Sequence, residues 1–174
     1  MPNWCDCVIT ISGSPEDMNE FIKAMKTPGL LQFNDFVPKL EGLPPYESFQ
    51  WCRTNWGTKW DIGEDEQLMD RNVDGSEITF SFPTAWSPPQ PFVMIVSGMY
   101  PSLAFHLSYC ETGMVFAGYV KYINSEVQYE YSCMWENDDE YEQFYNDTDE
   151  CDRRAWGIPE GGSYASDAES TDIE

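Results

Sequence analysis

The start of the chain alternates apolar and polar side chains and then changes to helical spacing. Residues 5 to 12 place every second side chain on one apolar face, which predicts a half-buried β-strand whose inward residues are Cys5, Cys7, Ile9 and Ile11. Ser14 and Pro15 have the residue types of an N-cap and a first helical position. The helix they predict ends before Pro28-Gly29 and buries Met18, Phe21, Ile22 and Met25.

The middle of the chain is rich in turn signals. Residues 30 to 50 contain several prolines and glycines, so we expect an ordered loop there. Residues 58 to 68 and 77 to 86 flank Asp74-Gly75, a dipeptide that favours tight turns, and they predict a long antiparallel hairpin. Alternate apolar residues of its second arm share one face, namely Ile78, Phe80, Phe82 and Trp86.

A second helix and further strands follow the hairpin. The helix is expected after Ser87-Pro88-Pro89 and before Pro101, with a buried stripe made of Phe92, Ile95, Val96 and Met99. Alternation then predicts strands over residues 103 to 110 and 114 to 123 and a last strand around Val127, Tyr129 and Tyr131.

The order of these elements is β-α-β-β-α-β with added strands. It is typical of the ferredoxin-like α+β fold, in which both helices cover one face of an antiparallel sheet. We therefore expect a ferredoxin-like domain over residues 1–133, an acidic helical extension over 134–157 and an acidic flexible tail over 158–174.

The extension has the pattern of an amphipathic helix. Asn137 and Glu140 resemble a capping box, and acidic residues suit the first turn. Arg153 and Arg154 suit the opposite end of the helix dipole, and Gly157 suits the stop. The predicted inner stripe carries no charge and consists of Tyr141, Phe144, Tyr145, Thr148, Cys151 and Ala155.

The charge of the chain is very uneven. The net charge is −22, and residues 126 to 174 carry 16 acidic residues against two basic ones, whereas residues 1 to 125 carry 15 against seven. Such a molecule repels nucleic-acid backbones and anionic membranes. We therefore expect neither of them as a partner, but the basic surface of a host protein or nucleoprotein complex.

The acidic helix approaches a nucleic acid in charge density. From Glu136 to Asp152 there are nine carboxylates and no base, which on a helix is about one charge per 2.8 Å, against about one per 1.7 Å for duplex DNA. Its outer face is a candidate nucleic-acid mimic, and the alternative is a solvated face that confers solubility. The predicted partner contacts are Asp138, Asp139, Glu142, Asp149 and Glu150.

A tryptophan-rich segment is the candidate ligand site of the core domain. On a strand Lys59 and Asp61 share a face, so we expect an ion pair beside indole rings. Such a pair suits a small-ligand or nucleotide pocket, and the alternative is a structural aromatic corner. The predicted pocket consists of Trp56, Lys59, Trp60, Asp61 and Trp86.

Other motifs indicate no catalytic or metal site. Residues 70 to 75 match the start of a calcium-binding loop, but Ser81 stands where its bidentate glutamate is required. The six cysteines lack zinc-ligand spacing, and we expect reduced, hydrophobic thiols. The single histidine, His106, has no nucleophile motif near it. We expect no metal and no cofactor, and the sequence favours a non-enzymatic protein.

Several short sequence blocks carry a family resemblance. They are Met1 to Cys5, Asn55 to Asp61, Pro83 to Pro89, Tyr109 to Gly113 and Phe116 to Gly118. In this order they resemble the YubB-type ferredoxin-like family of phages and plasmids, whose function is unknown. The resemblance implies a ferredoxin-like fold and a mobile-element origin, and it brings no catalytic residues.

Two main functional hypotheses follow, beside a third, a structural subunit of a larger assembly, which would form a stable stoichiometric complex insensitive to salt. The first is a phage or plasmid accessory protein that binds and inhibits a host nucleic-acid-processing or antiviral defence complex, by mimicry of nucleic acid. The second is a small-ligand or nucleotide-binding protein, or an enzyme, that uses the tryptophan-rich pocket. Because neither a signal peptide nor a membrane span is evident, we expect the cytoplasm of a bacterial host.

Overall fold

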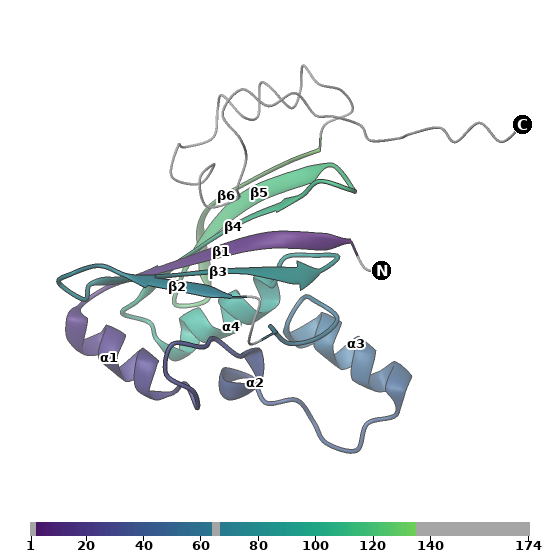
Figure 1. Ribbon diagram of the computed structural model, residues 1–174, viewed down its shortest axis with the longest axis horizontal. Helices are drawn as coiled ribbons and strands as arrows, with labels where there is room; N and C mark the ends of the chain where they lie inside the picture. The colour runs from purple at the N-terminus through teal and green to yellow at the C-terminus, as the bar shows by residue number, and fades with distance from the viewer. Residues whose placement is uncertain (1–2, 64–66, 135–174) are drawn as a thin grey trace, which may run out of the picture.

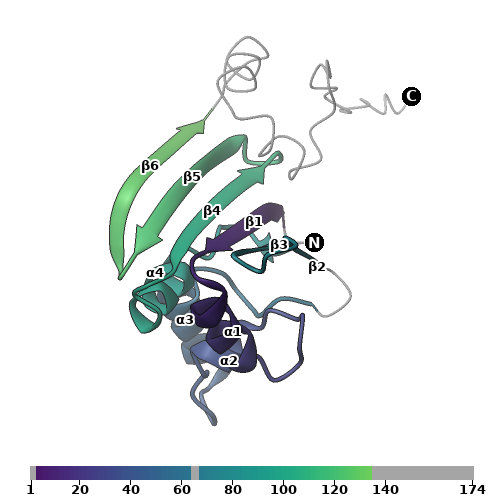
Figure 2. The same ribbon diagram turned by 90° about the vertical axis from the view of Figure 1, so that its left-hand side faces the viewer.

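A six-stranded antiparallel sheet with four helices on one of its faces forms the described part of the chain (Figure 1, Figure 2). The computed structural model describes residues 3–63 and 67–134. In chain order the elements are β1 (Trp4–Ser12), α1 (Pro15–Lys23), α2 (Phe33–Phe36), α3 (Pro45–Asn55), β2 (Leu68–Arg71), β3 (Glu77–Ala85), α4 (Gln90–Met99), β4 (Ala104–Glu111), β5 (Phe116–Ile123) and β6 (Glu126–Met134).

The strand order is β2-β3-β1-β4-β5-β6, and all neighbouring strands are antiparallel. Within it, β1, α1, β2, β3, α4 and β4 reproduce the β-α-β-β-α-β unit, with β1 between β3 and β4. The strands β5 and β6 continue the sheet beyond β4 (Figure 2). The predicted α+β, ferredoxin-like domain with added strands is confirmed, and the predicted C-terminal helix lies outside the described residues.

β1 and α1 form as their hydrophobic patterns predict. The inward residues of β1 are all buried, namely Cys5, Cys7, Ile9 and Ile11. Ser14 caps α1, because its side-chain oxygen accepts a hydrogen bond of 3.1 Å from the backbone N–H of Asp17. The helix ends at Lys23, short of Pro28-Gly29, and it lays Met18 and Phe21 against the sheet.

The expectation of a loop over residues 30 to 50 is wrong, because α2 and the first half of α3 lie there. Pro45 occupies the first turn of α3 and Pro44 stands at its N-cap. Proline suits this turn because it lacks an N–H that would have no partner there. The Pro-Pro pair that indicated a loop therefore starts a helix. α2 is anchored by Phe33 and Phe36, which are both buried.

The predicted hairpin has a much shorter first arm than residues 58 to 68. Among the described residues of this arm the strand is limited to Leu68–Arg71, and residues 58 to 60 form bends. Side chains explain this difference, because the Thr58 hydroxyl donates to the Ala85 carbonyl at 3.0 Å and the Asp61 carboxylate binds the backbone of α2. These bonds hold the segment against β3 and α2 in place of ladder pairing.

The turn between β2 and β3 is confirmed at Asp74-Gly75. Gly75 has a φ of +76°, and the Asp74 carboxylate accepts hydrogen bonds from the N–H and the hydroxyl of Ser76, at 2.9 and 2.7 Å. These bonds lower the pKa of Asp74. The Asn72 side-chain oxygen accepts from the N–H of Glu77. Oxygen atoms that matched a calcium loop are therefore engaged in closing the turn.

Aromatic rings from three helices meet between the helices and the sheet. The ring centroids of Phe33 and Phe92 lie 4.4 Å apart, and those of Phe21 and Phe36 lie 4.9 Å apart. Phe33 also contacts Phe82 of β3. These contacts fix α2 in the core even though it is only four residues long.

α4 turns a different stripe to the core from the predicted one. Its buried residues are Phe92, Val93, Val96 and Ser97, whereas Met99 is 52% exposed and Ile95 is half-buried. The cause is the turn between β5 and β6, which docks on α4. The Ser97 hydroxyl donates to the Met94 carbonyl and accepts from the N–H of Ser125.

β4, β5 and β6 form the predicted meander. Leu107 and Val120, which are paired across β4 and β5, are buried on the helix side. No helix in residues 3–63 and 67–134 is long and apolar enough to cross a membrane.

Gly57→Ala should destabilise the protein more than Gly42→Ala. Both glycines have a left-handed backbone, with φ of +85° and +74°, so each alanine carries a backbone cost of about 1–2 kcal/mol. At Gly57 the added Cβ would also lie 2.5 Å from Cδ of Pro91 and 2.9 Å from the carbonyl oxygen of Pro88, whereas nothing lies within 4 Å at Gly42. Urea unfolding should show an extra loss of about 1–3 kcal/mol for Gly57→Ala, and equal losses would contradict this packing.

Candidate functional site

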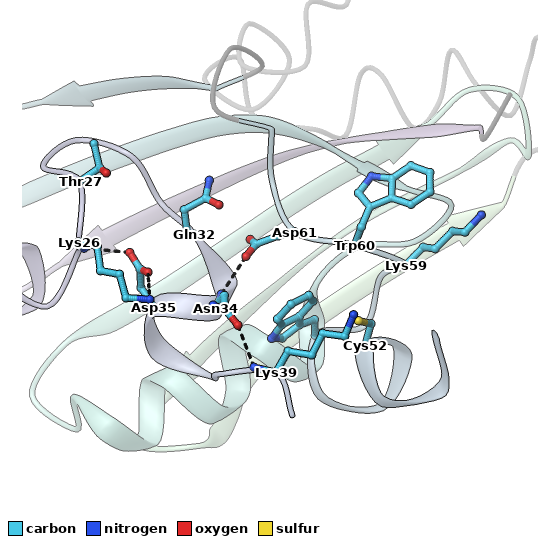
Figure 3. A pocket seen from close by; sticks show the side chains of 11 residues that line it. Lys26, Thr27, Gln32, Asn34, Asp35, Lys39, Cys52, Lys59, Trp60 and Asp61 are labelled. Carbon is cyan, nitrogen blue, oxygen red and sulfur yellow. Dashed lines mark hydrogen bonds and ion pairs between the residues drawn. The ribbon is translucent and has the colours of Figure 1, made fainter. Parts of the chain in front are cut away.

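An open pocket of about 450 Å³ lies beside α2 and contains four of the five residues predicted for a ligand site (Figure 3). Trp56, Lys59, Trp60 and Asp61 line it, together with residues of the segment from 26 to 39 and Cys52. Trp86 is not part of its lining. Four of the predicted residues therefore share one pocket, whose binding of a ligand stays a prediction, and their side chains have different roles.

Trp56 is a core residue. Its side chain is 3% exposed, and its indole N–H donates a hydrogen bond of 2.9 Å to the Val37 carbonyl. Its ring packs against those of Phe33 and Trp51, with centroids 5.9 and 5.4 Å away. Because its polar atom is engaged and its ring is buried, Trp56 forms the wall of the pocket and fixes α2 relative to α3.

Asp61 binds backbone instead of forming the predicted ion pair. Its carboxylate accepts hydrogen bonds from the N–H groups of Phe33 (2.6 Å), Asn34 (3.0 Å) and Ile62 (2.8 Å). Burial raises the pKa of this carboxyl, although the three N–H groups oppose the rise. In Figure 3 the Lys59 side chain extends away from Asp61, and no ion pair joins them in the described structure. The prediction fails because residues 58 to 61 are not a strand.

Lys59 lies between two indole rings. Its Nζ is 4.8 Å from the ring centroid of Trp60 and 4.7 Å from that of Trp86. Trp4 packs edge-on against Trp60, with centroids 6.1 Å apart. These four residues form the indole cluster, in which the three tryptophans are each 38–39% exposed. A cation over an exposed ring contributes about 0.5–1 kcal/mol, so the cluster holds the lysine at the pocket edge.

Trp86 has an unusual backbone for a bulky residue, with a φ of +73°. Its N–H donates to the Asn3 carbonyl at 2.9 Å, which fixes this conformation at the end of β3. A left-handed non-glycine residue costs about 1–2 kcal/mol. This backbone conformation directs the indole towards Lys59, and the contact between the two side chains offsets part of the cost.

The other polar residues of the pocket come from the segment that was predicted as a loop. Lys26 forms an ion pair of 3.1 Å with Asp35, at the opposite end of the pocket from Lys59 (Figure 3). Lys39 is the third lysine of the lining, and its N–H donates to the Asn34 side-chain oxygen. No local pattern pointed to these residues, because only the folding of α2 against residues 61 and 62 brings them into the same pocket as Lys59. The pocket thus has Lys59 beside two indole rings at one end and Lys39 and the Lys26–Asp35 pair in the rest of its lining. A cation beside exposed rings suits a small anionic or nucleotide-like ligand.

Cys5, Cys7, Cys52 and Cys110 are buried free thiols, as predicted, whereas Cys133 is partly buried and Cys151 lies outside the described residues. Sγ of Cys5 and Sγ of Cys7 lie 3.9 Å apart, and the Cys7 thiol lies 3.4 Å from the Thr84 hydroxyl. The hydrogen bond from Cys7 and burial raise the pKa of Cys5, and burial raises the pKa of Cys110 to about 12. Burial also raises the pKa of Cys52 in the pocket floor, against the field of Lys39. Neutral thiols are poor nucleophiles.

Residues 3–63 and 67–134 contain no group of three or more histidine, cysteine or acidic side chains placed to hold a metal ion. His106 lies on the sheet face opposite the helices, with its ring 5.9 Å from those of Tyr119 and Tyr129. The predicted partner contacts Asp138, Asp139, Glu142, Asp149 and Glu150 lie outside the described residues.

Comparison with known proteins identifies the family of this chain. A family model described as the ferredoxin-like domain in Api92-like protein matches residues 55–152, more than half of the chain. The chain belongs to this family. Among solved structures, the crystal structure of protein api92 from Yersinia pseudotuberculosis is 15% identical to it, with a TM-score of 0.46. That match covers 59% of this chain and 39% of the api92 chain. No curated protein matches the sequence.

Asp61→Ala should destabilise the fold, because it removes the acceptor of three backbone N–H groups. A hydrogen bond to a charged group contributes about 1.5–3 kcal/mol. The three bonds of Asp61 should together contribute less than three times this value, because water can partly replace the lost carboxylate. We expect a loss of about 2–4 kcal/mol in the free energy of unfolding, measured with urea. Glu41→Ala removes an exposed carboxylate and should change the value by less than about 0.5 kcal/mol. Equal effects of the two variants would contradict the role of Asp61.

Proposed function

We propose that this member of the family is a non-enzymatic phage or plasmid accessory protein that binds and inhibits a host nucleic-acid-processing or antiviral defence complex. The observation that supports the proposal is the segregation of charge. Residues 126 to 174 carry 16 acidic residues and two basic ones. The resemblance to the YubB-type family supports a mobile-element origin and, with it, the cytoplasm of a bacterial host.

The acidic segment has the composition of a surface that competes with nucleic acid. Nine carboxylates without a base between Glu136 and Asp152 give a field that attracts basic grooves at long range. The contact residues are Asp138, Asp139, Glu142, Asp149 and Glu150. A partner that normally binds DNA or RNA offers the complementary Lys and Arg side chains.

Neutralisation of the five contact residues should weaken capture of the partner. The full-length protein is immobilised and exposed to bacterial lysate, and bound proteins are eluted with a salt gradient and identified by mass spectrometry. We expect nucleic-acid-binding proteins, which the Asn/Gln variant of the five residues should release at lower salt. Rim charge pairs contribute about 0.2–1 kcal/mol each, so the loss of five of them should lower the affinity by about fivefold or more.

A matched control carries the same change of charge elsewhere. Glu16, Glu20, Glu41, Glu47 and Glu77 are exposed on the core domain, and their replacement by Gln also removes five negative charges. This variant should retain most of the binding. Equal losses in both variants, or capture that does not depend on salt, would contradict mimicry by the acidic segment.

A second candidate function is supported by the indole cluster and its pocket. Lys59 is held between Trp60 and Trp86 at the edge of a cavity of about 450 Å³ that two more lysines line. Exposed indoles stack on planar rings, and lysines attract phosphates. The pocket therefore suits a nucleotide-like anion.

Titration with ATP tests this second candidate. Calorimetry on the wild type should show binding that Trp60→Ala weakens at least about fivefold, since stacking contributes about 1–3 kcal/mol per base. Tyr46→Ala removes a 72% exposed aromatic side chain from α3 and serves as the control. Absence of binding to the wild type at millimolar ATP, or equal binding by Trp60→Ala, would exclude this ligand class.

A further inference from the structure

The face of the sheet opposite the helices contains a patch that is buried. Val8 of β1, Ser108 and Cys110 of β4 and Ala117 of β5 are only 4%, 1%, 3% and 0% exposed. All four described helices lie on the other side of the sheet (Figure 1, Figure 2). An open sheet face normally leaves such positions in contact with water.

The patch is continuous across neighbouring strands. Val8 is paired with Ser108, Cys110 with Ala117, and Ala117 with Cys133 of β6. β6 ends one residue later, at Met134. The chain therefore leaves the sheet beside the patch, and 40 residues follow it.

Aromatic side chains border the patch. The rings of Tyr119 and Tyr131 are stacked with centroids 5.6 Å apart, and Tyr119 also contacts Tyr129 and His106. Lys121 is the cation of this border, with its Nζ 5.9 Å from the Tyr129 ring. The surface is thus uncharged at Val8, Ser108, Cys110 and Ala117 and aromatic at one side, and the exposed carboxylate of Asp6, which is paired with Cys110, lies at its edge.

We infer that the segment from 138 to 155 covers this face as a helix, with its uncharged stripe against the sheet. The stripe predicted from the sequence is Tyr141, Phe144, Tyr145, Thr148, Cys151 and Ala155. This occupant belongs to the chain itself, and the proposal concerns the isolated protein whether or not a partner binds it.

The dimensions of segment and face agree. A helix of about 18 residues is about 27 Å long and about 10 Å wide, and a strand of about eight residues is also about 27 Å long. Three neighbouring strands such as β1, β4 and β5 span about 10 Å between the outer two. One helix therefore covers the patch along its length and width.

The charges of residues 138–155 and the range matched by the family model both favour this segment as the one that covers the face. With the stripe turned inwards, helical spacing points the carboxylates of Asp139, Glu142 and Glu150 to solvent, which avoids the high cost of burying unpaired charge. Asp149 lies at the border of the stripe, and Asp152 lies on it near its C-terminal end. The family match continues past β6 to residue 152. The family model therefore includes most of this segment and does not end with the sheet.

A photo-cross-link in the full-length protein tests the inference directly. Tyr119 is replaced by benzoylphenylalanine, the pure protein is irradiated, and the cross-linked peptides are identified by mass spectrometry. We expect cross-links within one chain from position 119 to residues 138–155. Tyr46, exposed on α3, carries the same probe as a control and should give none to that segment. Cross-links only between two chains, or none to residues 138–155, would overturn the inference.

Thiol protection provides a second measurement. The variant tested is Tyr141→Ser, Phe144→Ser, Tyr145→Ser. It should raise the alkylation rate of the Cys110 thiol at least tenfold. The thiols on the helix side of the sheet should stay protected, namely those of Cys5, Cys7 and Cys52. The control Asp139→Asn, Glu142→Gln, Glu150→Gln should leave Cys110 protected. Unchanged protection of Cys110 in the serine variant would overturn the inference. If all four thiols react, the variant has unfolded, and the cross-link decides.

Discussion

Burial of one face of β1 is the interaction on which the rest of the fold depends. β1 pairs with β3 along its whole length and with β4 along most of it. A slip of one residue in either pairing would turn Cys5, Cys7, Ile9 and Ile11 away from the helices. Their burial therefore sets the registers of β3 and β4, and these strands in turn position β2 and β5. The aromatic rings of Phe21, Phe33 and Phe92 then pack against a sheet whose strand registers are already set.

The parts of the fold that sequence predicted are those with a regular local pattern. β1, α1, α4 and the meander from β4 to β6 have alternation or helical spacing over at least eight residues. α2 and α3 were missed because their local signals are ambiguous. α2 is held by contacts with residues distant in sequence, and the Pro44-Pro45 pair is equally compatible with a loop and with a helix start.

Four residues of the pocket were predicted from the tryptophan-rich segment, but the roles of these residues were not predictable. The partners of Asp61 are backbone N–H groups 27 and 28 positions away, and no spacing rule relates them to it. Lys59 was assigned to an acid two residues along, whereas its neighbours are rings on two different segments. Such contacts depend on tertiary packing, which decides between a strand and a bend at residues 58 to 60. The acidic segment remains a prediction from composition and periodicity.

The central place of β1 also has a consequence for biosynthesis. β1 is synthesised before the other described strands, yet its two neighbours end at Ala85 and Glu111, about a hundred residues later in the second case. The hydrogen-bonding edges of β1 therefore stay unpaired, and its apolar face stays exposed, until much of the chain has been synthesised. Long-range pairing of this kind slows folding and leaves an aggregation-prone strand exposed until its partner strands have formed. The apolar face of β1 is therefore open to aggregation in the nascent chain for the period before β4 is synthesised.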